Sequence, residues 1–186
     1  NTHTHAAMSI FRGMGSDLPR DRWLQDVIFP AESLHVNPDL VYWGSLLAAV
    51  EMLKNGITTF CDGYFHEEAA VSAALDSGMR AVLGQGILDF PSPDQPDPGR
   101  SRERAEAFLS KFPAGMDRVR PSLFCHAPYT CCAETLQWVK ALCRDQGMLF
   151  QMHLSETEGE VRSLVQEQGT SPVRYLDQLG ILDSAT

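Results

Sequence analysis

The segment Phe150-Gln151-Met152-His153-Leu154-Ser155-Glu156 reads as a short apolar strand that ends in a histidine and is soon followed by a glutamate. Alternation along a strand places Phe150 and Met152 on one face and Gln151 and His153 on the other. His153 then lies at the carboxyl end of the strand, where α/β barrels keep their chemistry. A neutral imidazole can hold a metal ion, and a nearby carboxylate that is not a ligand can move a proton. Taken alone, the segment is more typical of a polar strand end that caps the next helix.

The amino-terminal residues Asn1-Thr2-His3-Thr4-His5 change that balance. In extended backbone His3 and His5 point to the same side, which is the geometry of two imidazoles on one metal ion. The alternative is a pair of exposed loop histidines. The chain has only six histidines, and two of them are separated by a single residue. A pair of metal ligands is therefore as good an interpretation as a pair of exposed loop histidines.

Apolar strands alternate with helical segments along the rest of the chain. Strands are predicted over 57–62, 80–87, 119–125 and 148–153, and a further strand end near residue 3. Helices are predicted over 37–55, 67–77, 100–112, 133–146, 157–168 and 171–180. Residues 6–36 are interpreted as a long connection over the substrate or the core, with a short helix at 20–28. This alternation predicts a parallel sheet with helical crossovers.

Three of the predicted strand ends carry polar groups: His3 with His5, His126, and His153 with Glu156. Such clustering is expected at the carboxyl edge of a parallel barrel. An open doubly wound sheet is the alternative, and the lack of a glycine-rich phosphate loop after the first strand weakens it.

The composition of the chain limits the classes of partner that it can bind. The 186 residues suit one domain, and the formal net charge of −9 argues against nucleic acid or an anionic membrane as the main partner. No apolar run reaches the length of a transmembrane helix. Five irregularly spaced cysteines predict reduced thiols in a cytoplasmic protein.

The pattern resembles the amidohydrolase superfamily, through His3-Thr4-His5 on a first strand and His153 with Glu156 on a fifth. Over nearly the whole chain it is similar to the methylthioadenosine/S-adenosylhomocysteine deaminases and related chlorohydrolases. The stretches that carry this likeness are 58–68, 78–81 and 126–131. The resemblance implies a (β/α)8 TIM-type barrel, of which residues 1–186 would hold about the first five β/α units. The remaining strands and any small β-sandwich domain would lie outside this chain, as would a metal-binding aspartate and a further histidine expected beyond Thr186.

The resemblance also implies site residues. His3, His5 and His153 match ligands of one divalent metal ion, for which zinc is favoured and iron or manganese is compatible. Glu156 matches the proton-transferring glutamate. Substrate-binding positions match Trp23, Glu32, Arg100 and His126. Gln85 stands where relatives carry an arginine. His35 and His66 are interpreted as structural, with His66 as a cap of the following helix.

The implied reaction is hydrolytic deamination of an adenine nucleoside, with metal-activated hydroxide attacking the amino-bearing ring carbon. The partner is then a small purine nucleoside, and a homo-oligomer is compatible. Two alternatives stay open: a chlorohydrolase or a guanine or cytosine deaminase on the same site, and an inactive amidohydrolase-like scaffold.

Overall fold

A sheet of four parallel strands forms the centre of the computed structural model, which describes residues 1–113 and 115–183. The strands follow their sequence order: β1 (Thr59–Tyr64), β2 (Arg80–Ile87), β3 (Val119–Cys125) and β4 (Leu149–Met152). A further strand end was predicted near residue 3, and there the structure has only a single parallel bridge, from Thr4 to Asp62. This bridge places the amino-terminal segment beside β1. The predicted strands over 80–87 and 119–125 are confirmed, whereas β1 begins and ends two residues later than predicted.

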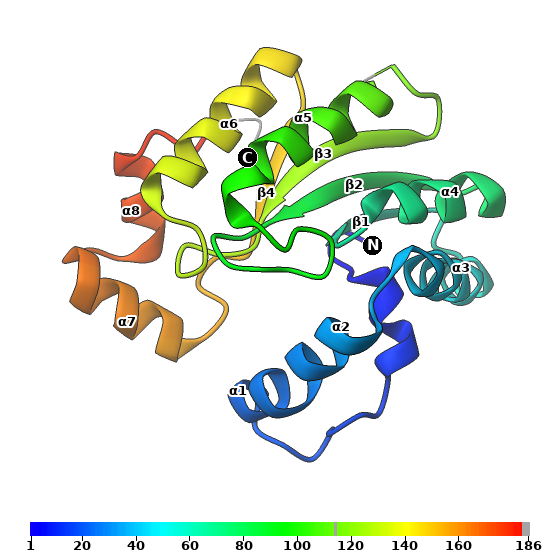
Figure 1. Ribbon diagram of the computed structural model, residues 1–186, viewed down its shortest axis with the longest axis horizontal. Helices are drawn as coiled ribbons and strands as arrows, with labels where there is room; N and C mark the ends of the chain where they lie inside the picture. Colours follow the sequence, from blue (N-terminus) through cyan, green and yellow to red (C-terminus); the bar gives the residue numbers. More distant parts are fainter. Residues whose placement is uncertain (114, 184–186) are drawn as a thin grey trace.

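Helices connect consecutive strands and form an arc around the sheet (Figure 1). The arc runs from α3 (Pro38–Lys54) through α4 (Glu67–Ser77), α5 (Ser101–Lys111) and α6 (Ala133–Gln146) to α7 (Glu158–Gln168) and α8 (Pro172–Gln178). A short 3-10 turn, Pro98–Arg100, precedes α5. Strands in sequence order with helices outside them make half of a (β/α)8 barrel, in agreement with the predicted fold class. No helix of the described residues is long and apolar enough to cross a membrane.

Local signals in the sequence set most helix ends. Asn37 accepts a hydrogen bond from the Leu40 N–H at 3.0 Å, and Pro38 takes the first helical position of α3. Gly78 and Gly147 end α4 and α6 in the left-handed conformation, with φ of 73° and 64°. These signals explain why α4 and α6 have the predicted bounds.

The two faces of the sheet differ in chemistry. Leu83, Leu123 and Phe150 are fully buried within the main hydrophobic core. Gln151, on the opposite face of β4 from Phe150, accepts from the Cys61 thiol at 2.7 Å and donates to the Ser122 hydroxyl at 2.5 Å. The polar face is the one that leads to His153, as the alternation in β4 predicted.

The segment before α3 differs from the prediction. The expected long connection contains a 3-10 helix (Ala6–Phe11) and then an unbroken helical run: α1 (Arg20–Trp23), a π-helical turn (Leu24–Ile28) and α2 (Phe29–His35). The prediction of one short helix at 20–28 was wrong because Pro30 reads as a helix breaker. Proline is tolerated near a helix start, and the π turn just before it shifts the hydrogen-bond register there.

Candidate metal centre and substrate cavity

Three histidines from opposite ends of the chain converge at the carboxyl edge of the sheet. Nε2 of His3 lies 3.4 Å from Nε2 of His5 and 3.2 Å from Nε2 of His153. One nitrogen from each ring lies within 4.8 Å of the other two. The predicted convergence of these side chains is confirmed.

The nitrogen spacing fits a tetrahedral metal ion. With metal–nitrogen bonds of about 2.0–2.1 Å, the edge of a ligand tetrahedron is about 3.3–3.4 Å. The two Nε2 separations, 3.4 and 3.2 Å, match that edge. Three imidazoles suit zinc and also iron. The described residues therefore offer three ligands for one divalent cation.

Burial favours the neutral form of two of the three histidines, His5 and His153, which is the form that a metal requires. Desolvation lowers the pKa of His5, and it lowers the pKa of His153 to about 3 with help from the neighbouring histidines. The Nδ1 atom of His5 lies 2.7 Å from the carbonyl oxygen of Gly63. Since a carbonyl only accepts, Nδ1 carries the proton and Nε2 keeps its lone pair for a metal.

Asp62 holds the His3-Thr4-His5 segment in place. Its Oδ1 accepts from the Thr4 hydroxyl and from the Ala6 N–H, both at 2.8 Å. The carboxyl is 1% exposed, and burial raises its pKa to about 6. Apart from the position of Asp62 near a strand end, no feature of the sequence indicates this role.

Glu156 stands in the loop after β4, and Glu160 fixes that loop. The two carboxylate oxygens of Glu160 accept from the N–H groups of Ser155 and Glu156, at 2.8 and 2.7 Å. Thr157 accepts in turn from the Glu160 N–H at 3.1 Å. The pattern Thr157-x-x-Glu160 is that of a capping box, but here the glutamate accepts from the two N–H groups before the N-cap Thr157. That pattern was the sequence signal that could have identified Glu160. Ser155 adopts the left-handed conformation with φ of 56° at this turn.

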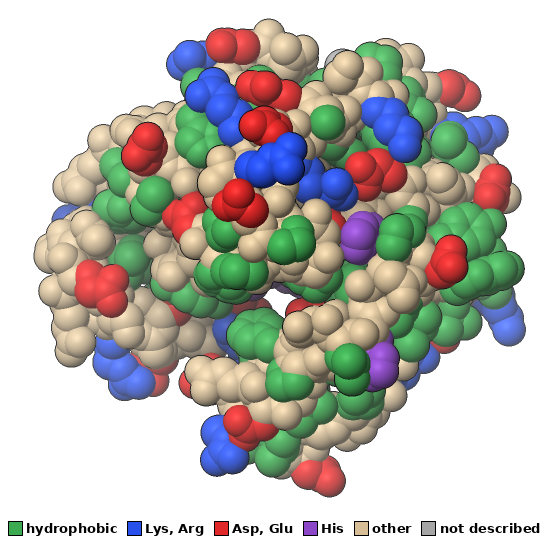
Figure 2. Space-filling model, in the orientation of Figure 1, with side chains coloured by type: hydrophobic (Ala, Val, Ile, Leu, Met, Phe, Trp, Pro, Cys, Tyr) green, Lys and Arg blue, Asp and Glu red, His purple; other side chains and the backbone are tan. Residues whose placement is uncertain are grey.

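A cavity of about 640 Å³ extends from the histidines between α2 and the loop that follows β2. Its opening lies near the middle of the face in Figure 2, with hydrophobic side chains around it. The predicted residues Trp23, Glu32, His126 and Glu156 all line it, together with His5 and His153. Most of the predicted site residues therefore line the same cavity.

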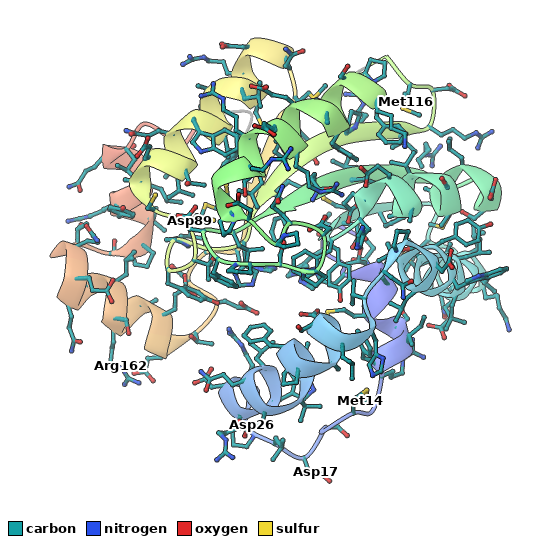
Figure 3. The ribbon with its side chains drawn as sticks, viewed as in Figure 1. Met14, Asp17, Asp26, Asp89, Met116 and Arg162 are labelled. Carbon is teal, nitrogen blue, oxygen red and sulfur yellow. The ribbon has the colours of Figure 1, made fainter. Side chains whose placement is uncertain are left out.

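Arg20, which was not predicted, also lines the cavity. Its Nη1 lies 3.3 Å from the Glu156 carboxylate, which joins α1 to the loop after β4. Met14 and Asp17, labelled in Figure 3, lie on the loop before α1. The Trp23 indole donates to the Met14 carbonyl at 2.8 Å, and this bond fixes the ring.

Glu32 is buried, His126 is half-buried, and both are hydrogen-bonded. The Tyr64 hydroxyl donates to Glu32 at 2.7 Å, and burial, partly opposed by this bond, raises the pKa of Glu32 to about 7. Nδ1 of His126 lies 3.0 Å from the Thr130 hydroxyl. Burial lowers the pKa of His126 to about 4, so its ring is neutral near pH 7.

Arg100 and His66 differ from their predicted roles. Arg100 pairs with Glu103 at 2.9 Å with 67% of its side chain exposed, and it does not line the cavity. The chain turns into α5 at Arg100, which directs the side chain outward along that helix. His66 precedes α4 as predicted, but its side chain caps no N–H group, because the residue has left-handed backbone with φ of 51°.

Curated relatives share this chain's sequence over nearly its whole length. It is 43% identical over 183 residues to a 5-methylthioadenosine/S-adenosylhomocysteine deaminase of Aquifex aeolicus, covering 98% of this chain and 42% of that protein. It is 39% identical over 186 residues to a 5'-deoxyadenosine deaminase of Methanothermobacter thermautotrophicus, covering 43% of that protein. The chain thus spans less than half the length of these relatives.

Solved structures share the fold. An adenosine deaminase from Xanthomonas campestris with bound zinc superimposes with a TM-score of 0.95 at 31% identity, over 100% of this chain and 42% of that one. The atrazine chlorohydrolase from Arthrobacter aurescens, complexed with zinc, gives 0.85 at 18% identity over 97% and 45%, which is a likeness of fold alone. A model described as the Amidohydrolase family matches residues 1–186. The chain therefore belongs to the amidohydrolase family, whose enzymes depend on metal ions.

Proposed function

We propose that the whole protein is a metal-dependent deaminase of adenine nucleosides of the methylthioadenosine/S-adenosylhomocysteine type. The observation that carries the proposal is the meeting of the His3, His5 and His153 ring nitrogens at the spacing of metal ligands. The 39–44% identity to proteins with deaminase names supports the substrate class. We further propose that residues 1–186 belong to one hydrolase barrel domain, and that free thiols at all five cysteines fit a cytoplasmic location.

The metal would be held by His3, His5 and His153, and zinc suits them best. Bound there, a divalent cation supplies a Lewis acid that brings the pKa of water close to neutrality. Glu156 has no place among these ligands but lines the same cavity. It would give a proton to the ring nitrogen beside the amino-bearing carbon and later pass one to the departing ammonia, as a general acid and base.

The other lining residues would bind the nucleoside. Ionised Glu32 accepts hydrogen bonds, so it suits the ribose hydroxyls. The fixed indole of Trp23 offers an apolar packing face, and the neutral His126 ring has a second nitrogen for a base nitrogen. Arg100, which points outward, is left out of this assignment.

Ammonia release from a panel of substrates, with chloride release measured for the chlorotriazine, tests the proposal on the full-length, zinc-loaded protein. The panel is methylthioadenosine, S-adenosylhomocysteine, adenosine, guanine and a chlorotriazine. Release from the adenine nucleosides is expected. Turnover of guanine alone would indicate a guanine deaminase, and turnover of the chlorotriazine alone would indicate a chlorohydrolase. A protein that binds no metal and turns over none of the five would be an inactive scaffold.

A further inference from the structure

The proline-rich loop, residues 89–98, forms one wall of the cavity. Its apolar side chains Phe90, Pro91, Pro93 and Pro96 line the space. Ser92 and Gln95 form an antiparallel bridge that closes the loop on itself. Proline fixes its own φ angle, so a loop with four prolines loses little conformational entropy when it is held in one shape.

Asp94 anchors this loop to the neighbouring elements. Its side chain is 0% exposed, and its Oδ2 accepts from the His66 N–H and from the Gln85 amide, both at 2.8 Å. The same oxygen lies 3.1 Å from Nε of Arg104, and Oδ1 accepts from the Ser92 hydroxyl at 3.1 Å. A buried carboxylate is tolerated when it is paired and hydrogen-bonded in this way. The loop is therefore tied to β2, α5 and the turn before α4 through one side chain.

Arg104 and Asp89 extend the anchoring. Arg104 also pairs with Glu68 at 3.0 Å, which links α5 to α4 beneath the loop. At the start of the loop Asp89, labelled in Figure 3, accepts from the Cys132 N–H at 2.5 Å and the Thr135 hydroxyl at 2.7 Å. The carboxylates of Asp89 and Asp94, which are held by neighbouring elements, lie outside the cavity lining. The loop's lining residues therefore carry no charge: Phe90, Pro91, Pro93 and Pro96 are apolar, and Ser92 is polar.

The charged groups that line the cavity belong to other walls. Glu32 comes from α2, and Arg20 of α1 pairs with Glu156 of the loop after β4. The apolar residues Leu24, Ile28 and Phe29 line the cavity on the helical run that contains Glu32. A nucleoside whose amino-bearing carbon reaches the histidines and whose hydroxyls reach Glu32 still has its 5′ substituent to place. The proline-rich loop offers that substituent an uncharged wall.

We propose that Asp94 and Arg104 are positioning residues that hold the proline-rich loop as a stiff apolar subsite, and that this subsite selects adenine nucleosides with an uncharged 5′ substituent. This inference rests on the proposed function. A thioether methyl gains contacts against the loop, and such differences in apolar contact are worth about 10- to 200-fold in selectivity. The ammonium and carboxylate of an amino-acid tail would lose hydration there without receiving a partner from the loop.

The first experiment compares kcat/KM for methylthioadenosine, 5′-deoxyadenosine, adenosine and S-adenosylhomocysteine in the full-length, zinc-loaded protein. Methylthioadenosine is expected to exceed S-adenosylhomocysteine by tenfold or more. Equal or reversed preference would overturn this inference while leaving the deaminase proposal standing. Failure to release ammonia from any of the four would instead overturn the proposed function.

The second experiment loosens the wall with Asp94→Asn. The variant is expected to raise KM for methylthioadenosine and 5′-deoxyadenosine at least tenfold, with less than threefold change for adenosine and in kcat. Asp97→Asn is the matched control, because Asp97 lies on the same loop but is exposed and caps only the Gly99 N–H. An equal loss on all substrates, or no loss, would contradict the positioning role.

A third variant tests whether the 5′ substituent lies against the proline-rich loop, and it leaves Asp94 and Arg104 unchanged. Phe90 is 45% exposed, so Phe90→Arg should fold. A cation at this position is expected to raise the ratio of S-adenosylhomocysteine to methylthioadenosine turnover at least tenfold, by pairing with the carboxylate of the tail. An unchanged ratio would place the 5′ substituent against a different wall.

Discussion

At the scale of single residues, the pairing of Glu32 with Tyr64 is the contact most open to measurement. The carboxyl is 7% exposed and the phenol is 5% exposed, so the hydrogen bond between them is screened from water. Burial raises the pKa of Glu32 to about 7, while the phenol lowers it by donating to the ionised form. Glu32 therefore changes charge within the pH range of ordinary assays.

This pairing predicts the pH dependence of kcat/KM. Ionised Glu32 accepts hydrogen bonds from ribose hydroxyls more strongly than the neutral acid does. We therefore expect kcat/KM to fall as the pH drops through about 7. Tyr64→Phe removes the donor that favours the ionised form, so the acidic limb should move to higher pH. Tyr175→Phe, on α8, should leave the limb in place. A limb that stays fixed in Tyr64→Phe would exclude Glu32 as its source.

Glu156→Gln should keep the fold and the metal but lose most of the activity. The amide can occupy the same space but cannot transfer a proton, and general acid–base catalysis typically contributes about 10²–10⁴-fold. Steady-state ammonia release, with metal content measured alongside, checks the expected loss. Glu158→Gln is the control, because Glu158 is 83% exposed and pairs with Arg162 at 3.3 Å. Turnover by Glu156→Gln within threefold of the parent would show that another group moves the proton.

At the scale of elements, the start of α7 connects stability with the site. Glu160→Ala removes the acceptor of the Ser155 and Glu156 N–H groups. The loss of a capping interaction should cost about 1 kcal/mol in the free energy of unfolding. Activity should fall about tenfold or more, since a misplaced catalytic group can cost about 10²-fold.

Denaturant unfolding and kcat measured on the same samples separate these two effects. Glu167→Ala, at an exposed position of the same helix, should change neither. Loss of stability with normal kcat would mean that Glu156 reaches its position without help from Glu160.

The sequence predicted elements well where local signals set them, and poorly where tertiary packing did. Asn37, Gly78 and Gly147 mark helix ends by their own chemistry, and those ends were predicted. The helical run across Pro30 was missed, because its π turn is supported by packing of Ile28, which is 1% exposed. No local sequence pattern within residues 24–30 predicts that packing.

The same division applies to the site. Alternation and strand order placed His3, His5 and His153 at one edge, since the carboxyl ends of parallel strands meet there. Arg100 was assigned through the resemblance to a family position, and only the fold shows that its side chain points outward. Asp94 and Arg20 act across elements distant in sequence, so no spacing rule could have selected them.

At the scale of the whole molecule, a buried acid predicts how stability changes with pH. Glu67 is 0% exposed and neither carboxyl oxygen has a hydrogen-bond partner among the described residues. Desolvation raises its pKa well above 4.5, with the nearby Asp62 and Asp94 acting in the same direction. The folded state therefore holds a proton that the unfolded chain releases above about pH 4.5.

The stabilising effect of that proton is complete below pH 4.5 and is lost as the pH rises toward the raised folded-state pKa. The slope is about 1.4 kcal/mol per pH unit for one proton. Relative to the parent, Glu67→Gln should thus become more stable as the pH is raised from 5 to 8, by denaturant unfolding. Glu106→Gln, whose side chain is 53% exposed and pairs with Arg102, is the control. A stability difference that does not vary with pH would mean that Glu67 is ionised in the folded protein.

Metal removal should destabilise the molecule as a whole. The ligands come from the segment beside β1 and from the end of β4, so a bound ion joins the two borders of the sheet. Binding to the folded state alone adds about 2.7 kcal/mol at a free metal concentration 100 times Kd. Thermal unfolding should therefore shift down on chelation. The shift should vanish in His153→Ala and persist in His35→Ala, an exposed histidine of α2. An equal shift in both variants would place the metal elsewhere.

The separation of these ligands in the sequence also affects when, during synthesis of the chain, the metal can bind. His3 and His153 are 150 residues apart, and a ribosome adds about 5–20 residues per second. The first two imidazoles would leave the ribosome roughly 8 to 30 s before the third. During that interval the nascent chain can offer zinc only two nitrogens, which is too few to retain it against competing cellular ligands. Metal acquisition would thus follow the docking of β4, so a molecule that has loaded its ion has already completed this sheet.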